Sequence, residues 1–395
     1  MGVLCISPLI PILKLKHFSP LLPSLKFSQS KTSSMEDFSQ SKASMEEIAF
    51  CGYDNASPTV PCLEWFSIKL DPYPVYSSHE NKRVKLNHNQ LKPFSVSDFD
   101  KHRQHEAIGS NLCYIDGLNV MISLDINNPS DGWKLSPPMT LSRHYPKTTV
   151  LDGKLYVLGG FASNSPPNLN GWMEVFDPIS QTWNSLANPP SPICPYNFTC
   201  SALESKKQIL VIEDSADMCR TKFHTYDVNT TCWTTCEIQS HDLFVHRSSK
   251  TPVAVGTTLY WVDMDDCNKA DYCLIQAYDL DKDVWLHGGF NTGQIFRSPE
   301  IDFTGYLPRL VHLGGQKFWF LLQSSIFKRC VAVISYVSCF IFEVSPIFED
   351  DGKGKHNHDE DDDDDASFPK LRISLVSIHR YPLPHALCIL DTLLL

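Results

Sequence analysis

The chain has 395 residues, of which 42% are hydrophobic, 11% aromatic and 20% charged, so it has enough apolar side chains to bury a core and is not disordered throughout. Its length fits one large domain or two ordinary ones. The formal net charge of −11 argues against a general nucleic-acid binder, which usually needs a basic face.

The first 45 residues are expected to form a targeting-like or non-native disordered segment outside the fold. Residues 1–34 are apolar, rich in serine and free of acidic side chains, and prolines at positions 8, 11, 20 and 23 interrupt them, so they do not form a continuous membrane helix. Two alternatives stay open: a native transit peptide for organelle import, or a non-native stretch ahead of a start at Met35 or Met45. Without a transit peptide we expect a cytoplasmic or nuclear protein, or both.

Residues 46–107 are predicted to be a linker region that contributes a strand. The stretch CLEWFSIKL at 62–70 alternates between polar and apolar residues, as a half-buried strand does. KRVK at 82–85 resembles a short nuclear-import signal. Four-residue matches of this kind are frequent by chance, so we favour an exposed linker here.

The tryptophans from residue 130 onward mark an internal repeat. Trp133, Trp183, Trp233 and Trp285 are spaced by 50, 50 and 52 residues. An aromatic–Asp phrase precedes three of them, with the Asp six residues ahead of the Trp: VFDP at 175–178, TYDV at 225–228 and AYDL at 277–280. A looser copy, SLDI at 123–126, precedes Trp133.

A predicted pair of strands precedes each phrase. The clearest pair is KTTVL (147–151) and KLYVLGG (154–160), joined by Asp152-Gly153, and Asp-Gly between two apolar runs is a strong hairpin signal. Weaker copies begin near residues 201, 252 and 309. Each unit therefore predicts four antiparallel strands in about 50 residues, which is the size of a propeller blade.

These motifs resemble kelch-repeat proteins, particularly plant proteins in which kelch repeats are often fused to an F-box. The residues that carry the resemblance are DGKLYVLGG at 152–160, Asp177-Pro178 and Trp183, and it covers roughly residues 108–385. It implies an all-β fold, a kelch-type β-propeller of five or six four-stranded antiparallel blades, over residues 108–395. Two units depart from the pattern, because Glu213-Asp214 and Asp263-Met264 replace the diglycine.

We assign the repeat residues to the construction of the blades. Glycine permits a backbone geometry and a close approach that a Cβ would block, Asp accepts hydrogen bonds from the turn that it opens, and Trp supplies apolar area between blades. The residues are Gly153, Gly159, Gly160, Asp177, Asp227, Asp279, Trp133, Trp183, Trp233 and Trp285.

The C-terminal part fits the repeat less well. Residues 323–342 do not match it, although the apolar run at 330–342, which is too short to cross a bilayer, favours a buried strand pair. Residues 349–365 carry ten acids and two lysines, so we expect an acidic disordered insertion at 349–367. Residues 371–378 alternate like a strand. This segment, or residues 62–70, would complete a blade or close the ring by pairing across the chain ends.

No enzymatic or metal-binding motif is apparent. The 14 cysteines lack two matched pairs at zinc-finger spacing, and we expect mostly reduced, buried thiols. The sequence contains no nucleophile elbow, phosphate-binding loop, HExxH or dinucleotide fingerprint. We therefore expect no catalytic residues, no metal, no cofactor and no enzymatic activity.

The resemblance places candidate contact residues on the loops that lead into the first strand of each blade. These loops share one face with the loops between second and third strands. Arg143, Arg247 and Arg297 recur at comparable points, as arginines do in related propellers that bind acidic or polar peptides, although they could instead pair with nearby Asp on the rim. The complete candidate set is Arg143, His144, Tyr145, Tyr196, Asn197, His246, Arg247 and Arg297.

The expected function is a non-enzymatic protein-interaction module that binds a partner through one propeller face. The first alternative is the substrate receptor of a ubiquitin ligase, with a Skp1-type adaptor as a partner, although the N-terminal segment shows no Leu-Pro-x-Glu-type F-box run. The second is a galactose-oxidase-like oxidoreductase, because that enzyme shares the propeller architecture. We expect no nucleic-acid partner and no membrane association, and the sequence does not identify the protein partner.

Overall fold

The structure is a computed structural model. It describes residues 47–54, 62–70, 84–87, 89–97, 104–115, 119–161, 171–194, 198–214, 220–239, 251–264, 272–291, 301–302, 309–328, 331–347, 370–385 and 387–395. These residues form β-strands and two short 3-10 turns, η1 (Pro129–Asp131) and η2 (Glu204–Lys206). No helix in these ranges has the length and apolar character needed to cross a bilayer. The N-terminal segment 1–45 and the acidic insertion 349–367 lie outside the described residues.

The first half of the ring consists of three four-stranded antiparallel sheets, which we call blades I to III. Blade I contains β26 (Leu387–Leu394), β1 (Glu47–Asp54), β2 (Leu63–Lys69) and β4 (Ser95–Ser97). Blade II contains β5 (Gln104–Ile108), β6 (Asn111–Ile115), β7 (Met121–Asp125) and β8 (Lys134–Leu135). Blade III contains β9 (Lys147–Leu151), β10 (Lys154–Leu158), β11 (Met173–Asp177) and β12 (Thr182–Ser185).

Blades IV to VI follow in chain order. Blade IV contains β13 (Phe198–Leu203), β14 (Gln208–Asp214), β15 (Arg220–Asp227) and β16 (Cys232–Gln239). Blade V contains β17 (Val253–Val255), β18 (Thr258–Met264), β19 (Tyr272–Asp279) and β20 (Val284–Asn291). Blade VI contains β22 (Val311–Gly314), β23 (Lys317–Lys328), β24 (Val331–Ile347) and β25 (Lys370–Pro382), and β21 (Ile301–Asp302) pairs with β23.

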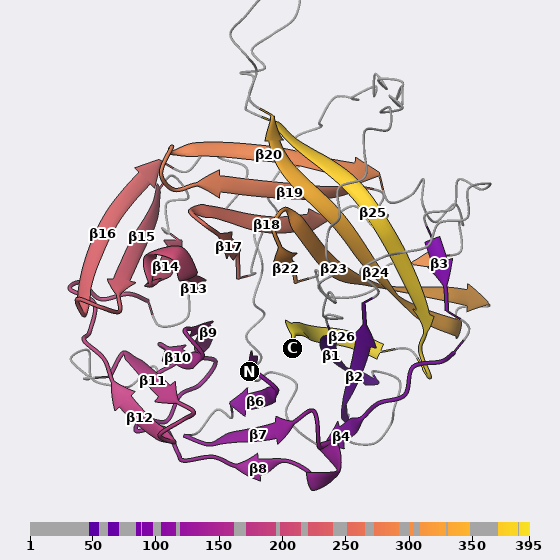
Figure 1. Cartoon of the computed structure of the whole chain (residues 1–395), viewed down its shortest axis with the longest axis horizontal. Coiled ribbons are helices and arrows are strands. Elements are labelled where there is room, and N and C mark those ends of the chain that lie inside the picture. The colour runs from indigo at the N-terminus through magenta and orange to yellow at the C-terminus, as the bar shows by residue number, and fades with distance from the viewer. Residues whose placement is uncertain are drawn as a thin grey trace, which may run out of the picture. The chain divides into compact units, whose positions relative to one another are not determined.

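The first strands of the blades form a closed ring. Around the centre, β5 contacts β9, β9 contacts β13, β13 contacts β17, β17 contacts β22, β22 contacts β26, and β26 contacts β5. Figure 1 looks along the axis of this ring, with the blades radiating outward. The described residues therefore form a six-bladed propeller, which confirms the all-β, kelch-type fold predicted from the repeat.

The two ends of the described chain close the ring. Strand β26 pairs antiparallel with β1, from Ile48 opposite Leu394 to Asp54 opposite Leu387. Of the two alternatives predicted for residues 62–70 and 371–378, the structure has the completion of a blade: residues 63–69 form β2 of blade I, and residues 371–378 belong to β25 of blade VI. Other strands make the pairing across the chain ends. Residues 46–107 supply β1, β2, β4 and most of β5, which is more of the ring than the single strand expected.

One apolar cluster fills each gap between neighbouring blades. Along β10, for example, Tyr156 and Leu158 pack toward blade IV while Leu155 and Val157 pack toward blade II. Alternate residues of a strand point to opposite faces, and both faces of a blade are covered. Strands such as β23, with Phe318 to Leu322 all buried, therefore contain continuous apolar runs instead of alternating ones.

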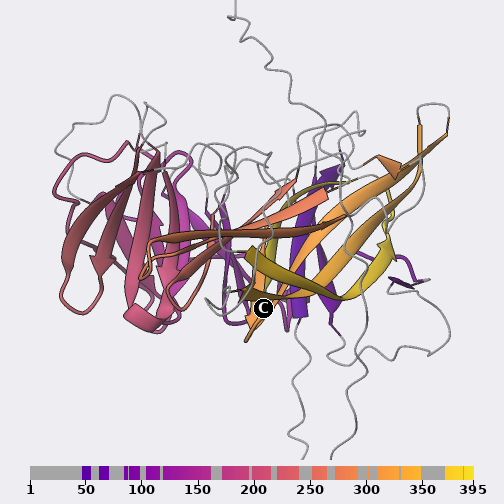
Figure 2. The ribbon, with the colours of Figure 1, turned by 90° about the horizontal axis from the view of Figure 1, so that it is seen from above.

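Blade VI differs from the others in its length and its outer pairing. Strands β23 and β24 form one long hairpin from Lys317 opposite Glu343 to Lys328 opposite Val331, so residues 323–328 and 331–342 belong to blade VI. Figure 2 shows these strands and β25 extending obliquely past the shorter blades. Outer strand β25 pairs in parallel with β20 of blade V and with β3 (Val84–Leu86). The KRVK stretch at 82–85 thus ends within a strand, although its first two residues lie outside the described residues.

Candidate functional site

Antiparallel strands divide the loops of the ring between two faces. The segment that leads into the first strand of a blade and the loop between its second and third strands lie at the same ends of the strands. We call this the lead-in face. The tight turns between first and second strands, and the aromatic–Asp turns between third and fourth strands, lie on the opposite face, which we call the turn face. The contact residues predicted from the sequence are expected on the lead-in face.

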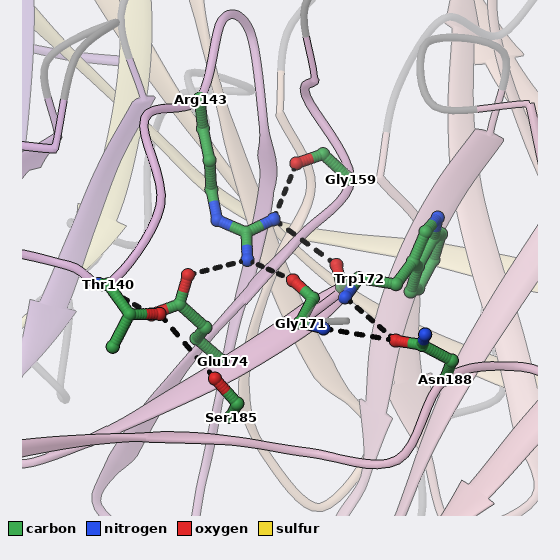
Figure 3. A network of polar contacts seen from close by, with 8 residues as sticks. All are labelled: Thr140, Arg143, Gly159, Gly171, Trp172, Glu174, Ser185 and Asn188. Atoms are coloured by element: carbon green, nitrogen blue, oxygen red, sulfur yellow. Dashed lines mark hydrogen bonds and ion pairs between the residues drawn. The ribbon is translucent and has the colours of Figure 1, made fainter. Parts of the chain in front are cut away.

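Arg143, at the centre of the predicted contact set, is buried in blade III. Its side chain is 0% exposed, and so is that of its partner Glu174 on β11. One guanidinium nitrogen donates to Glu174 Oε1 at 2.8 Å and to the carbonyl of Gly171 at 2.6 Å. The other donates to the carbonyls of Gly159 at 2.6 Å and Trp172 at 3.2 Å. Figure 3 shows the guanidinium enclosed by these acceptors.

The surroundings of Arg143 and Glu174 complete the network. The second Glu174 oxygen accepts from the backbone N–H of Thr140 at 2.8 Å and from its hydroxyl. The amide oxygen of Asn188 accepts from the N–H groups of Gly171 and Trp172. Burial lowers the pKa of the Arg143 guanidinium, whereas the adjacent Glu174 carboxylate opposes that shift. A side chain with no exposed surface does not contact a partner, so Arg143 is a scaffold residue of the lead-in loop, contrary to the sequence prediction.

His144 and Tyr145 emerge from the loop that Arg143 anchors. Both are exposed, Tyr145 by 54%. Tyr145 has φ 53°, a left-handed conformation that is unusual for a bulky residue and that only a constrained loop maintains. The N–H of His144 donates to the carbonyl of Gly160, which ties the loop to the end of β10. The structure thus fixes the backbone from which these two side chains project.

The remaining predicted contact residues are Tyr196, Asn197, His246, Arg247 and Arg297. All five lie outside the described residues, so their place on the lead-in face stays a prediction. Within the described part of that face, His144 and Tyr145 are the predicted contact residues that reach solvent.

The diglycine of blade III belongs to the same construction. Gly159 offers its carbonyl to Arg143, and Gly160 has φ 73° with no room for a Cβ, which would lie 2.7 Å from the backbone nitrogen of Pro146. In blade IV, Glu213 takes the place of Gly159, because Ile212 and Leu158 occupy equivalent register positions. Glu213 accepts from the N–H of Cys194 in the lead-in loop and approaches His224 at 3.3 Å.

Blades III and IV therefore anchor their lead-in loops with different pairs of polar residues. In both, the buried polar residue lies three positions before the aromatic–Asp turn: Glu174 in blade III and His224 in blade IV. The loop residue Arg143 meets the carboxylate in blade III, whereas the strand-end residue Glu213 meets the imidazole in blade IV. This arrangement explains how blade IV dispenses with the diglycine.

The Asp and Trp of the repeat build the turns and the contacts between blades. Asp177 Oδ1 accepts from the N–H groups of Ile179 and Ser180, and Asp227 and Asp279 accept from the corresponding positions of their turns. The indole N–H of Trp183 donates to the carbonyl of Pro137, and that of Trp233 to the carbonyl of Ala187. Each indole thus bonds to the segment that follows the preceding blade.

Each aromatic–Asp turn also contains a residue with positive φ, two positions before the Trp. These residues are Gln181 at 56°, Thr231 at 57° and Asp283 at 54°. None of the three residues is a glycine, so the sequence alone does not reveal their left-handed conformation. The left-handed conformation disfavours side chains with a Cβ, and most of all β-branched ones.

Replacing Thr231 by glycine should therefore stabilise the protein. We expect Thr231→Gly to raise the free energy of unfolding in urea by about 1 kcal/mol, the usual cost of the left-handed conformation for a residue with a Cβ. Thr230→Gly is the matched control: Thr230 has no positive φ, so glycine there relieves no strain, and the greater freedom that it gives the unfolded chain should lower stability. A stabilised Thr230→Gly, or a destabilised Thr231→Gly, would contradict this account of the turn.

A second polar cluster, which the sequence did not reveal, lies on the first strands at the centre of the ring. It joins Glu106 on β5, Arg309 just before β22 and Asp391 on β26. Arg309 donates to Asp391 Oδ1 at 3.0 Å and lies 3.8 Å from Glu106 Oε1. His105 lies 3.8 Å from Asp391, and the Thr148 hydroxyl donates to Glu106 at 2.7 Å. We call these five residues the channel cluster.

Burial and charge act against each other in the channel cluster. Burial raises the pKa of Glu106 above its ordinary value, although Arg309 partly offsets the shift. Burial alone would also raise the pKa of Asp391, but Arg309 and His105 together outweigh it and the pKa is lowered. Burial would lower the pKa of Arg309, yet Asp391 and Glu106 raise it overall. One guanidinium is therefore shared between two buried carboxylates.

Neither cluster contains a set of metal ligands. Among the described residues, no group of three or more His, Cys, Asp or Glu side chains is arranged to hold a metal ion. Five of the described cysteines are buried thiols. Burial raises the pKa of Cys113 and Cys200, next to the channel cluster, to about 12, so these two thiols stay protonated and act as small apolar residues.

Comparison with known proteins agrees with the geometry of the ring. The family described as FKB95, Kelch-repeats domain, matches residues 65–331. The chain belongs to this kelch-repeat family. The kelch match begins in β2, inside blade I, and extends through blade V into the β23–β24 hairpin, so the kelch domain includes residues that the sequence motifs alone left in a linker.

Several similar proteins come from Arabidopsis thaliana. The putative F-box/kelch-repeat protein At4g39290 is 27% identical over 49% of this chain and 51% of its own length. The F-box/kelch-repeat protein At4g19330 is 34% identical over 34% of this chain and 36% of its own, and At4g39550 is 40% identical over 22% and 23%. This kelch-repeat chain therefore spans about half the length of the first of these relatives and less of the others.

Proposed function

We propose that this kelch-repeat chain is a non-enzymatic module that binds a protein partner through its lead-in face. The observation that carries the proposal is the exposed pair His144 and Tyr145, held on a loop that Arg143 and Gly160 fix to the blade. Tyrosine is enriched among the residues that dominate interface energies. Binding residues are effective when a rigid scaffold fixes their loop, because little conformational entropy is lost on binding.

Affinity purification from plant-cell extract tests this proposal. We expect the double variant His144→Ala/Tyr145→Ala to recover the partner with about tenfold lower yield or worse, since an exposed aromatic anchor contributes about 1.4 kcal/mol or more. The matched control is Ile179→Ala. Ile179 is 93% exposed in the turn between β11 and β12, on the turn face of the same blade. Unchanged recovery with the double variant, or loss with the control, would reject this face.

The substrate receptor of a ubiquitin ligase is the more specific form of this proposal. It is favoured by the relatives named F-box/kelch-repeat proteins, and it would add a Skp1-type adaptor as a second partner. The adaptor should then be recovered equally with wild type and with the His144→Ala/Tyr145→Ala variant, because the substrate binds the lead-in face and the adaptor does not. Recovery of a partner without any Skp1-type adaptor would leave the chain as a simple binding module.

A further inference from the structure

The channel cluster borders a cavity of about 200 Å³ at the centre of the ring. The cavity lies between the first strands β5, β17, β22 and β26, and its polar lining includes Glu106, Arg309 and Thr392. Its remaining walls are largely aliphatic, from residues such as Val253, Leu310 and Leu393. A cavity of about 150 Å³ is large enough for benzene, so this one admits a short aliphatic chain with a polar end.

Among the described residues, the cluster beside the cavity has one more carboxylate than guanidinium. Arg309 is the cation that faces Glu106 and Asp391, at 3.8 Å and 3.0 Å. The side chains that face Glu106 are Thr148 on β9, Cys200 on β13, Cys113 on β6, His105 on its own strand, and Arg309 and Asp391. The cluster carries two carboxylates and one guanidinium, and buried carboxylates need a partner.

Two hydrogen-bonding atoms at the cavity have no partner among the described residues. Glu106 uses Oε1 to accept from Thr148, while no described donor reaches its Oε2. Thr392 is 2% exposed, and its hydroxyl is buried without a hydrogen bond. A buried hydroxyl with no partner is costly, and a ligand with N–H donors would satisfy both oxygens.

We propose that this cavity binds a primary alkylammonium group, with the ammonium at Glu106 and Thr392 and the alkyl chain against the aliphatic wall. An ammonium has three donors and no acceptor, which matches two free oxygens and a missing positive charge. Both carboxylates would repel an anion, because the positive charge of Arg309 already pairs with Glu106 and Asp391. The lysine side chain of a partner protein and a free aliphatic amine share this chemistry. The proposal is independent of partner binding by His144 and Tyr145.

Binding should depend on pH through Glu106. Its pKa is raised by burial, so on acidification this carboxyl takes up its proton, and ceases to attract a cation, earlier than an ordinary glutamate does. A bound ammonium favours the ionised form and lowers that pKa. The affinity should therefore be highest at neutral pH and fall as pH decreases through the raised pKa of Glu106.

Calorimetric titration of the full chain with three probes of one shape tests the proposal. At pH 7 we expect n-butylammonium to bind at one site, and n-butanol and butyrate at least about tenfold more weakly, since a charge-assisted hydrogen bond contributes about 1.5–3 kcal/mol. Glu106→Gln should weaken n-butylammonium by about tenfold or more, on the same basis. The control Asp281→Asn removes an exposed carboxylate that pairs with Lys206 and should leave binding unchanged.

The selectivity of the wild-type protein decides the outcome even if Glu106→Gln fails to fold, and Thr392→Val supplies a second variant that should also bind more weakly. Equal affinity for n-butanol, tighter binding of butyrate, or unchanged affinity in Glu106→Gln would overturn the proposal.

Two further probes distinguish the two sources of the ammonium group, a lysine side chain and a free amine. Tighter binding of Nα-acetyl-lysine methylamide than of cadaverine supports a lysine side chain of a protein, and the reverse order supports a free amine.

Discussion

Replacing Arg143 by methionine should lower the free energy of unfolding by about 3–5 kcal/mol, because it leaves the carboxylate of Glu174 buried and unpaired. Both side chains are 0% exposed, so water does not replace the lost guanidinium. The carbonyls of Gly159, Gly171 and Trp172 lose their donor at the same time. Urea denaturation monitored by tryptophan fluorescence measures the change.

Two further variants separate a buried ion pair from a general effect of losing a cation. In Arg143→Met/Glu174→Gln the uncompensated charge is absent, so this double variant should be more stable than Arg143→Met alone. Lys207→Met removes an exposed lysine that bridges to Asp152 of the neighbouring blade, and its stability should be nearly unchanged. If Arg143→Met lost partner binding while keeping wild-type stability, Arg143 would be a contact residue after all.

Gly160→Ala should lower the free energy of unfolding by roughly 3 kcal/mol or more. The left-handed conformation costs about 1–2 kcal/mol for a residue with a Cβ, and forced overpacking costs about 1–3 kcal/mol. The new Cβ would lie 2.7 Å and 2.8 Å from the backbone nitrogen and Cα of Pro146 and 2.9 Å from the carbonyl oxygen of His144. All three are backbone atoms of the lead-in loop, so the whole loop has to move. The displaced loop should also bind the partner more weakly.

Gly153→Ala is the matched control for that substitution. Gly153 has φ 69°, close to the 73° of Gly160, but a methyl group added at Gly153 would meet no atom within 4 Å beyond its chain neighbours. Gly153→Ala should therefore lower the free energy of unfolding only by the cost of the left-handed conformation, roughly 1–2 kcal/mol. Equal losses in the two variants would show that backbone conformation alone requires glycine at 160, and that the loop does not pack against β10.

The sequence predicts the middle of the ring because the repeat is strictly local. In blade III, Asp152 and Gly153 both have positive φ, as a two-residue hairpin turn requires, and the turn joins strands whose register then fixes which residues face each neighbour. Asp177 and Trp183 act within a few residues of their own turn or at the adjacent blade. Such features depend on neighbouring residues in the chain, so spacing alone reveals them.

Blade I could not be predicted from the sequence, because its strands come from both ends of the chain. Strand β1 pairs with β26, more than 330 residues away in the sequence, and no aromatic–Asp phrase marks either. The channel cluster could not be predicted for the same reason, because Glu106, Arg309 and Asp391 meet only when the ring closes. An isolated acidic residue on a short strand gives no sign of a partner at this distance.

Arg143 shows how a correct position leads to a wrong role. The sequence placed it on the lead-in loop of blade III, where the structure also has it. Its partner Glu174 lies on β11, 31 residues away, and nothing in the loop sequence distinguishes an arginine that points inward. The exposed neighbours His144 and Tyr145 occupy the same loop, so the proposed contact surface shifts by one or two residues while the proposed face stays the same.

Site-specific photo-cross-linking tests the central claim, that the lead-in face binds a protein, most directly. A photoreactive benzoylphenylalanine replaces Tyr145 in one version of the full chain and Ile179 in another. Both positions are exposed on blade III, one on each face. On irradiation in plant-cell extract, we expect a protein adduct from position 145 and none from position 179. Adducts from position 179 alone, or from neither position, would contradict binding through the lead-in face.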